Sequence, residues 1–226
     1  MTGFSIFVLC HRYGARGRAM LRSLALQSDD APAFNVAVYY ARQRDAEMLI
    51  EGAGLDVDLQ LIQVPESKVI YRAQHFSKAK PDKPYTIFVD SDLWFPPTFL
   101  AKYAQEIESR PLGYWGAWVK NVEWEKSEPL LARWQSLTET DMAPFDIPGW
   151  RFDSCAGRVG HFQCIPTGLV RYPWWPEPGT DVQDGVFAQR ALDKSVDAGL
   201  SPDRRIGPTV FHFDHPNNPK GVSEDL

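Results

Sequence analysis

Cysteine is scarce in this sequence, with only Cys10, Cys155 and Cys164 in a chain of 226 residues. Three cysteines do not make a disulfide framework, so we expect free thiols in a reducing compartment. An apolar run long enough to span a membrane is also missing, and no signal peptide is recognisable, which predicts a soluble, cytoplasmic protein. The net charge of −5 argues against nucleic acid as a partner.

Two glycine-rich phosphate-binding signatures are absent as well. Gly14 and Gly17 follow the first apolar run, but no third glycine completes a dinucleotide fingerprint and no Gly-Lys-Ser completes a P-loop. The sequence shows no internal repeat and no low-complexity segment. Its hydrophobic fraction of 44% is ample for a sizeable core.

Apolar runs alternate with helical patterns in the first part of the chain. Strands are predicted at 4–10, 34–40, 57–64 and 85–89, with helices at 18–27, 42–52 and 67–80. This alternation implies a mostly parallel sheet with helices on its faces. Later patterns are less regular, with helices at 98–109, 127–140 and 181–193, strands at 113–119, 161–166 and 209–213, and an irregular segment at 144–160.

We therefore expect one α/β domain over 1–226. A Rossmann-like, nucleotide-binding half should cover 1–97, and an irregular half that binds an acceptor should cover 98–215. The segment 216–226 is expected to be a loosely ordered tail.

Two carboxylates, Asp90 and Asp92, come directly after the predicted buried strand at 85–89. Ligands of open α/β sheets bind at the carboxyl ends of the strands. Two carboxylates separated by one residue suit a hard cation, Mg²⁺ or Mn²⁺, which in turn holds phosphate oxygens. The plainer alternative is that Asp90 and Ser91 only cap the helix that starts near Pro97.

Basic residues gather in two stretches, and both lie before this pair of aspartates. They are Arg12, Arg16, Arg18 and Arg22 in the first, and Lys68, Arg72, Lys78, Lys80 and Lys83 in the second. Together with a cation motif they suggest a phosphorylated ligand, whereas each alone also fits a solvated helix face. Arg12 and Arg72 are the candidates for charge-assisted hydrogen bonds to a diphosphate.

Four motifs, in this order, resemble the GT-A family of nucleotide-sugar glycosyltransferases, closest to its inverting, family-2-like and β-1,4-galactosyltransferase-like members. They are the opening strand that ends in Cys10-His-Arg12, the Asp90-Ser-Asp92 DxD motif, the helix from Asp181-Val-Gln-Asp184 to Arg190, and Phe211-His-Phe-Asp-His215. The resemblance covers nearly the whole chain. It implies a GT-A fold and transfer of a sugar from a nucleotide-sugar donor, such as a UDP-sugar, to a saccharide or other hydroxyl acceptor.

The resemblance also assigns roles at the cation and at the reacting hydroxyl. Asp92 would bind the cation directly, and Asp90 would contact it through water or contact the ribose. A histidine would complete the cation site, with His212 the first choice and His215 the second. Asp184 would be the general base of an inverting transfer; its plainer role is to complement the amino end of a helix.

The remaining assignments concern the base and the acceptor. The family usually has an acid after the second strand that reads the nucleotide base, whereas here no acid follows until Asp45. Tyr39 or Tyr40 would then read the base. Trp174 and Trp175 are candidates for an acceptor platform, because indole faces stack on sugar rings. His161 and Gln163 are weaker acceptor candidates.

Two other functions remain open from the sequence. A phosphohydrolase of the haloacid-dehalogenase type also has an apolar strand that ends in Asp-x-Asp, with Asp90 as nucleophile and Asp92 as acid and base. That motif normally ends the first strand, whereas three strands precede it here. The other candidate is a module that binds nucleotide sugars without turning them over.

Overall fold

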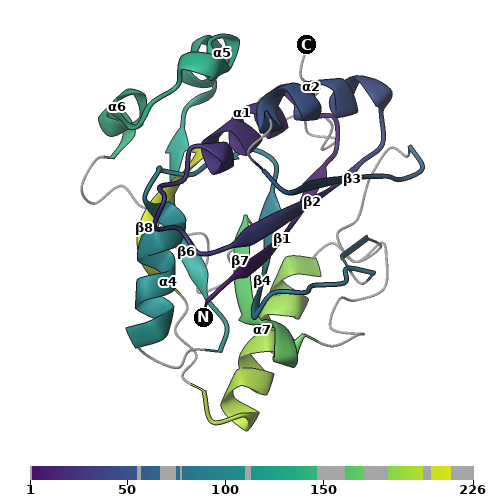
Figure 1. The fold of residues 1–226 in the computed structure, drawn as a ribbon, viewed down its shortest axis with the longest axis vertical. Helices are drawn as coiled ribbons and strands as arrows, with labels where there is room; N and C mark the ends of the chain where they lie inside the picture. Colours follow the sequence, from purple (N-terminus) through teal and green to yellow (C-terminus); the bar gives the residue numbers. More distant parts are fainter. Residues whose placement is uncertain are drawn as a thin grey trace.

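The computed structural model describes residues 2–54, 57–66, 75–76, 78–109, 113–146, 161–170, 183–200 and 205–214. A five-stranded sheet with the order β3-β2-β1-β4-β7 forms its centre (Figure 1). The strands β1 (Phe4–Cys10), β2 (Phe34–Tyr40), β3 (Leu59–Gln63) and β4 (Tyr85–Asp90) run parallel, and β7 (Phe162–Pro166) runs antiparallel to β4. The predicted mostly parallel sheet is therefore confirmed.

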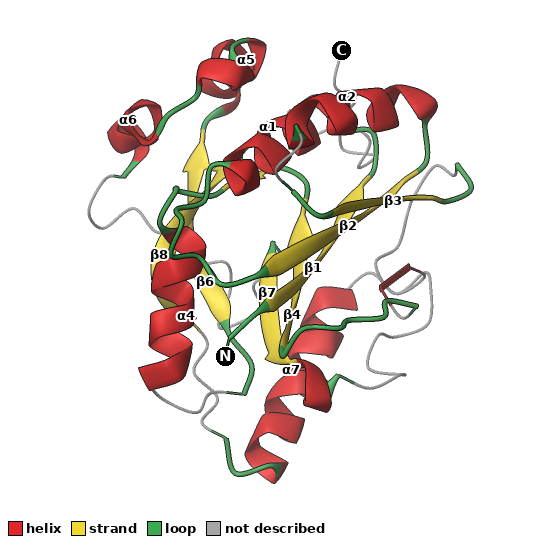
Figure 2. Ribbon diagram, in the orientation of Figure 1, coloured by secondary structure: helices red, strands yellow, loops and turns green. Residues whose placement is uncertain are grey.

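Helices cover both faces of this sheet because the side chains of its central strands alternate between two apolar cores. Ile6 and Val8 belong to the core under α1 (Gly14–Ala25), α2 (Gln43–Ala53) and α4 (Phe99–Ser109). Phe7 and Leu9 belong to the core under α7 (Gln183–Asp197). Figure 2 shows α1 and α2 on one side of the sheet and α7 on the other. A strand buried on both faces reads as a continuous apolar run, which is why β1 and β4 were predictable.

A second sheet of three strands has the order β5-β8-β6. It consists of β5 (Leu93–Trp94), β6 (Gly116–Val122) and β8 (Arg205–Phe213). One face packs on the chain from α5 (Trp124–Ala132) through the 3₁₀ turn η1 (Trp134–Ser136) to α6 (Glu139–Met142). Two further 3₁₀ turns, η2 (Ala143–Phe145) and η3 (Thr167–Leu169), complete the described elements.

Several predicted boundaries differ from the structure. The helix expected at 127–140 is split, because Thr138 and Asp141 form a capping box that starts the separate helix α6. The strand expected at 113–119 begins at Gly116, and α1 begins at Gly14 rather than at residue 18. The sequence did not predict β5, since two residues carry no periodicity. The helix expected at 67–80 lies mostly outside the described residues.

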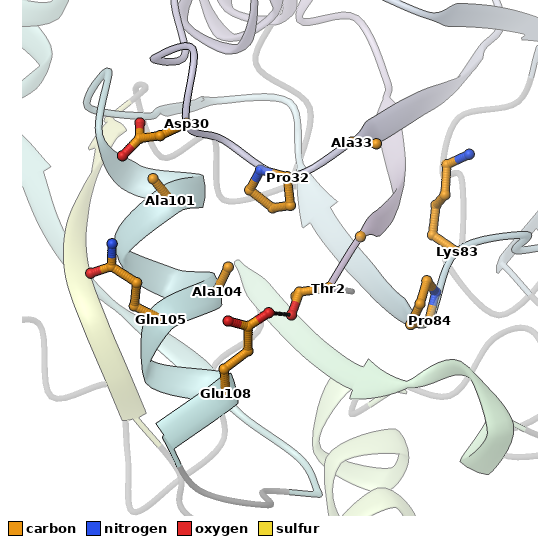
Figure 3. Close-up of a pocket in the computed structure, with 11 residues that line it drawn as sticks. Thr2, Asp30, Pro32, Ala33, Lys83, Pro84, Ala101, Ala104, Gln105 and Glu108 are labelled. Carbon is orange, nitrogen blue, oxygen red and sulfur yellow. Dashed lines mark hydrogen bonds between the residues drawn. The ribbon is translucent and has the colours of Figure 1, made fainter.

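A cavity of about 630 Å³ opens at the amino-terminal edge of the large sheet (Figure 3). It lies between the start of β1 and α4, where the Thr2 hydroxyl donates a hydrogen bond to Glu108. The carboxyl ends of the parallel strands lie at the opposite edge, so this cavity is separate from Asp90 and Asp92. No helix in the described part of the chain is long and apolar enough to cross a membrane.

Candidate metal centre

The small sheet brings Asp92 and His212 together across 120 residues of sequence. Strand β5 pairs with β8 so that Leu93 lies opposite His212, and the Phe213 amide donates to the Asp92 carbonyl at 2.8 Å. These backbone bonds place His212 Nε2 at 3.1 Å from Asp92 Oδ2, with both side chains only 7% exposed. The capping role that the sequence left open for Asp90 and Ser91 is not supported, because α4 starts at Phe99.

His161 joins this pair from the large sheet. Because β7 runs antiparallel to β4, its first residues lie at the carboxyl end of β4, where the Asp90 amide donates to the His161 carbonyl at 3.1 Å. His161 Nδ1 also lies 3.0 Å from Asp90 Oδ2. The ring centroids of His161 and His212 are 4.5 Å apart. Asp90 therefore contacts His161, which lies beside His212.

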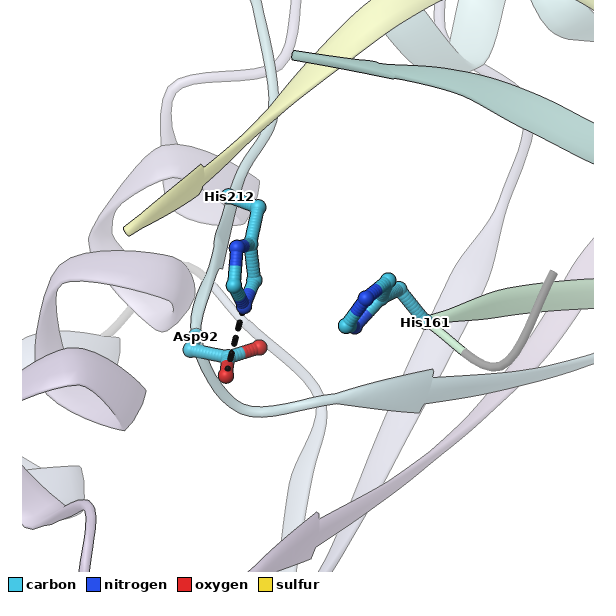
Figure 4. Close-up of side chains that lie close together, drawn as sticks. All are labelled: Asp92, His161 and His212. Carbon is cyan, nitrogen blue, oxygen red and sulfur yellow. Dashed lines mark hydrogen bonds and ion pairs between the residues drawn. The ribbon is translucent and has the colours of Figure 1, made fainter. Parts of the chain in front are cut away.

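Asp92, His161 and His212 form a group whose candidate ligand atoms all lie within 4.8 Å of one another (Figure 4). A divalent ion with ligands at 2.0–2.1 Å and right-angle geometry has adjacent ligand atoms about 3.0 Å apart. The separation of 3.1 Å between Asp92 Oδ2 and His212 Nε2 fits one edge of such an octahedron. Carboxylate and imidazole are both ordinary ligands of a divalent cation, so the residues present fit the cation that the sequence predicts.

The protonation of His212 reflects its two partners. Burial lowers the pKa of the imidazole, but the charge and hydrogen bond of Asp92, with smaller contributions from Asp90 and Asp214, raise that pKa above its ordinary value. The other nitrogen, Nδ1, lies 3.0 Å from Asn121 Oδ1, on the neighbouring strand β6. A proton on Nε2 and a cation at this centre would therefore compete for the same position beside Asp92.

Tyr39, one of the residues predicted to read the nucleotide base, lies at the same edge, at the end of β2. The Tyr39 ring stacks on the His75 ring with centroids 5.8 Å apart and 27° between the planes. Both line a pocket of about 370 Å³ together with Ile62, Gln63, Val64, Pro65 and Lys78. Burial, followed by the ammonium of Lys78, lowers the pKa of His75. The pocket therefore brings Tyr39, His75 and Lys78 together at the carboxyl edge of the large sheet.

Arg12 follows β1 in a backbone conformation that is unusual for a side chain of its size. Its φ is 66°, in the left-handed region, which costs a non-glycine residue about 1–2 kcal/mol. Among the described residues it is the only non-glycine residue with a positive φ. Its guanidinium lies 3.6 Å from Glu66, which follows β3. Strained backbone of this kind is common where a loop approaches a ligand.

Two of the other predicted basic residues have structural roles instead. Arg16 is 1% exposed, donates to the Asp214 carbonyl at 3.2 Å and pairs with Glu128 at 3.1 Å. Arg18 pairs with Glu51 at 2.8 Å and lies over the Trp134 ring. Arg16 is thus neither a phosphate ligand nor part of a solvated face, and it fixes the chain two residues after His212.

The remaining predicted residues are divided between buried positions and undescribed ones. Gln163 is 1% exposed in β7, in register with Phe88, so it lies within the sheet. Asp184 is the second residue of α7, but its side chain is not among those described. Arg72, Trp174, Trp175 and His215 lie outside the described residues.

Sequence reasoning missed Asn121 and His75, and it assigned His161 to the acceptor rather than to the cation group. The strand predicted at 161–166 places His161 at its start, but the sequence does not reveal that this strand pairs antiparallel with β4. Nothing local marks Asn121, since its role depends on its alignment with His212 across two strands.

The fold is of the α/β class with a mostly parallel central sheet, as the sequence predicts. Comparison with solved structures shows that the fold of this chain is similar to that of GT-A-type nucleotide-sugar glycosyltransferases. Neither a family model nor a curated protein sequence matches the chain.

Three of these solved structures show the extent of the similarity. Residues 1–349 of TarS from S. aureus, in complex with UDP-GlcNAc, have a TM-score of 0.67 at 15% identity over 100% of this chain and 62% of that one. The mannosyltransferase PcManGT from Pyrobaculum calidifontis, with GDP-Man and Mn²⁺, gives 0.60 at 13% identity over 95% and 58%. Glucosyl-3-phosphoglycerate synthase from Mycobacterium tuberculosis, with Mg²⁺ and UDP, gives 0.57 at 13% identity over 95% and 73%.

Proposed function

We propose that this protein is a divalent-cation-dependent glycosyltransferase that uses a nucleoside diphosphate sugar. The observation that carries the proposal is the buried contact between Asp92 and His212 at the carboxyl edge of the large sheet, where ligands of open α/β sheets bind. Mn²⁺ or Mg²⁺ at this centre would neutralise the charge that develops on the leaving diphosphate. The solved structures of the same fold contain UDP-GlcNAc, GDP-Man or UDP, two of them with Mn²⁺ or Mg²⁺, which supports this donor class.

The chain's own residues would bind the rest of the donor. The pocket of Tyr39 and His75 offers ring faces to a nucleotide base, and the adjacent Lys78 favours a negatively charged ligand. Arg12 lies at the end of β1, where its guanidinium would donate charge-assisted hydrogen bonds to the diphosphate. A UDP-sugar is the donor we propose.

Asp184, at the amino end of α7, would take the proton from the acceptor hydroxyl as that oxygen attacks the anomeric carbon. One base with in-line attack inverts the anomeric configuration. Trp174 and Trp175 would form the platform for a saccharide or other hydroxyl acceptor. The division into a donor half at 1–97 and an acceptor half at 98–215, and a cytoplasmic location, remain predictions from the sequence.

The haloacid-dehalogenase alternative is not supported by the topology. The Asp90-Ser-Asp92 segment begins at the last residue of β4, the fourth strand along the chain, and Asp92 pairs with a histidine from the second sheet. Asp90, which would have to accept the phosphoryl group, has its Oδ2 at 3.0 Å from His161 Nδ1. A binding module without turnover is one outcome of the test that follows.

The test begins with a panel of nucleotide sugars in the presence of Mn²⁺ or Mg²⁺. We expect one donor to raise the melting temperature and to be hydrolysed slowly, and Asp184→Asn to keep this stabilisation. Transfer or hydrolysis by Asp184→Asn should fall by roughly two to four orders of magnitude, the usual contribution of a positioned base. Asp193→Asn, in the exposed part of the same helix, is the matched control.

Three outcomes separate the possible functions. NMR of the product should show the anomeric configuration opposite to that of the donor, and retention would contradict the inverting mechanism. Donor binding without turnover in the parent protein would identify a binding module. Phosphate release from simple phosphomonoesters, with no response to any nucleotide sugar, would favour the phosphohydrolase.

A further inference from the structure

We infer that His161 is a third ligand of the cation and that the resulting set of two imidazoles and one carboxylate selects Mn²⁺ over Mg²⁺. This inference rests on the proposed function, because it concerns the cation of the same centre. It is argued from the group of Asp92, His161 and His212, whose candidate ligand atoms lie within 4.8 Å of one another (Figure 4). Asp92 lies in the turn before β5, His161 is the residue before β7, and His212 belongs to β8.

Both histidines are oriented in the same way by an oxygen that accepts from Nδ1. An ionised carboxylate only accepts hydrogen bonds, so Asp90 Oδ2 at 3.0 Å holds the proton on Nδ1 of His161. Asn121 Oδ1 at 3.0 Å does the same for His212. Each pairing leaves Nε2 to donate its lone pair to a cation, and a carboxylate behind a histidine also makes that ligand more basic.

This arrangement gives Asp90 a role different from that of a direct ligand. If both aspartates bound a divalent cation, their charges would cancel that of the ion. With one carboxylate and two neutral imidazoles, the ion and its direct ligands together carry a charge of about +1 toward the diphosphate, and the charge of Asp90 lies behind His161. Three protein ligands also leave about three positions of an octahedral ion open, enough for two phosphate oxygens and one water.

The selectivity follows from the chemistry of the ligands. Mg²⁺ prefers oxygen ligands and gives up its water reluctantly, whereas imidazole suits first-row transition-metal ions. A second imidazole therefore adds more to the affinity for Mn²⁺ than to the affinity for Mg²⁺. His161, rather than the aspartates, would determine which of the two ions the centre holds.

The experiment measures cation binding by the full chain without any nucleotide. Calorimetry with MnCl₂ and with MgCl₂ gives the affinity ratio, and pulsed electron paramagnetic resonance of bound Mn²⁺ counts the coordinated imidazole nitrogens. We expect two nitrogens in the parent protein. His161→Gln should leave one nitrogen and lower the ratio of Mn²⁺ to Mg²⁺ affinity by about tenfold or more, the scale on which changes near a metal act.

Three further variants make the result specific. His161→Asp restores a ligand as an oxygen, so it should recover Mg²⁺ binding without recovering the preference for Mn²⁺. Asp90→Asn should weaken Mn²⁺ binding less than His161→Gln does, because it disturbs only the orientation of the ring. His75→Gln, whose ring lies in the Tyr39 pocket, should leave the ratio unchanged.

The inference and the proposed function fail in different ways. One coordinated nitrogen in the parent protein, or two nitrogens and an unchanged ratio in His161→Gln, would overturn the role of His161 while a cation site remained. A folded parent protein that binds neither ion would instead contradict the proposed function. If His161→Gln has no folding transition, the nitrogen count of the parent protein and the behaviour of His161→Asp decide.

Discussion

The His75 imidazole makes stability depend on pH. Its pKa in the folded protein is held below the ordinary value, first by burial and then by Lys78. An unperturbed histidine in the unfolded chain has a pKa of about 6.5. Below that pH the unfolded state therefore binds more protons than the folded state. The free energy of unfolding should therefore decrease as the pH falls from about 6.5 through the folded-state pKa, and this group should contribute no change at higher pH.

This prediction is checked by urea unfolding across that pH range in the parent protein and in His75→Gln. The parent curve should lose stability toward the acid side more steeply than the variant curve, because only the parent has this imidazole. Parallel curves would show that His75 does not carry the effect and that other groups cause any loss.

The residues that the sequence predicted best are those whose neighbours in the chain reveal them. Asp90 and Asp92 follow a run of buried residues directly, so their place at the edge of the sheet could be inferred. His212 required the family resemblance, because its proximity to Asp92 depends on the pairing of β5 with β8. Arg16 was misjudged because a sequence shows the charge of a side chain but not its burial, and Arg16 is only 1% exposed.

At the scale of elements, the crossing of α1 and α2 depends on one glycine. A Cβ placed on Gly52 would lie 2.3 Å from the Arg18 carbonyl oxygen and 2.6 Å from its Cα. Backbone atoms cannot move aside as a flexible side chain can, so the two helices would have to separate. We expect Gly52→Ala to lower the free energy of unfolding by about 1–3 kcal/mol, the usual cost of overpacking.

A melting curve compared with that of Gly168→Ala checks this expectation. No atom lies within 4 Å of a Cβ placed on Gly168, so that change adds the same methyl group without a clash. Equal melting temperatures for the two variants would show that the helices tolerate a wider crossing.

The same crossing explains why the start of α1 was predicted too late. Glycine has a low helix propensity, so Gly14 and Gly17 indicated a loop before the helix predicted at 18–27. In the structure both face α2, where a Cβ would meet Asp45 or Leu49 within 2.9 Å. Close packing between two helices determines the choice of residue here, and local propensity does not reveal such packing.

At the scale of the whole molecule, the candidate cation site joins segments that are far apart in sequence. The contact between Asp92 and His212 spans 120 residues, and that between Asp90 and His161 spans 71. An ion that binds only this folded arrangement stabilises it, by about 2.7 kcal/mol at a concentration one hundred times its dissociation constant. For a chain of this size, that corresponds to a rise in melting temperature of roughly 5–10 °C.

Differential scanning calorimetry with increasing MnCl₂ measures this rise. Asp92→Asn should abolish it, because the amide removes the charge that the cation needs. Asp30→Asn, at the opposite edge of the sheet, should preserve it. A rise of the same size in Asp92→Asn would place the stabilising cation elsewhere.

The class of the fold could be predicted from the alternation of strands and helices, whereas the second sheet could not. Strand β8 was expected only at 209–213, and its place between β5 and β6 depends on pairings over long distances in sequence. Such pairings leave no periodic signal, although they build the side of the site that contains His212.

Strand β8 is the middle strand of the small sheet, and it is the last described strand along the chain. During synthesis, β5 and β6 therefore leave the ribosome without the strand that will lie between them. The nascent protein can assemble β1 to β4 early, but Asp92 can pair with His212 only after β8 has been synthesised. Arg16 then fixes the newly arrived strand through the Asp214 carbonyl. A chain interrupted before β8 would thus keep its DxD motif and still have no partner histidine from that strand for Asp92.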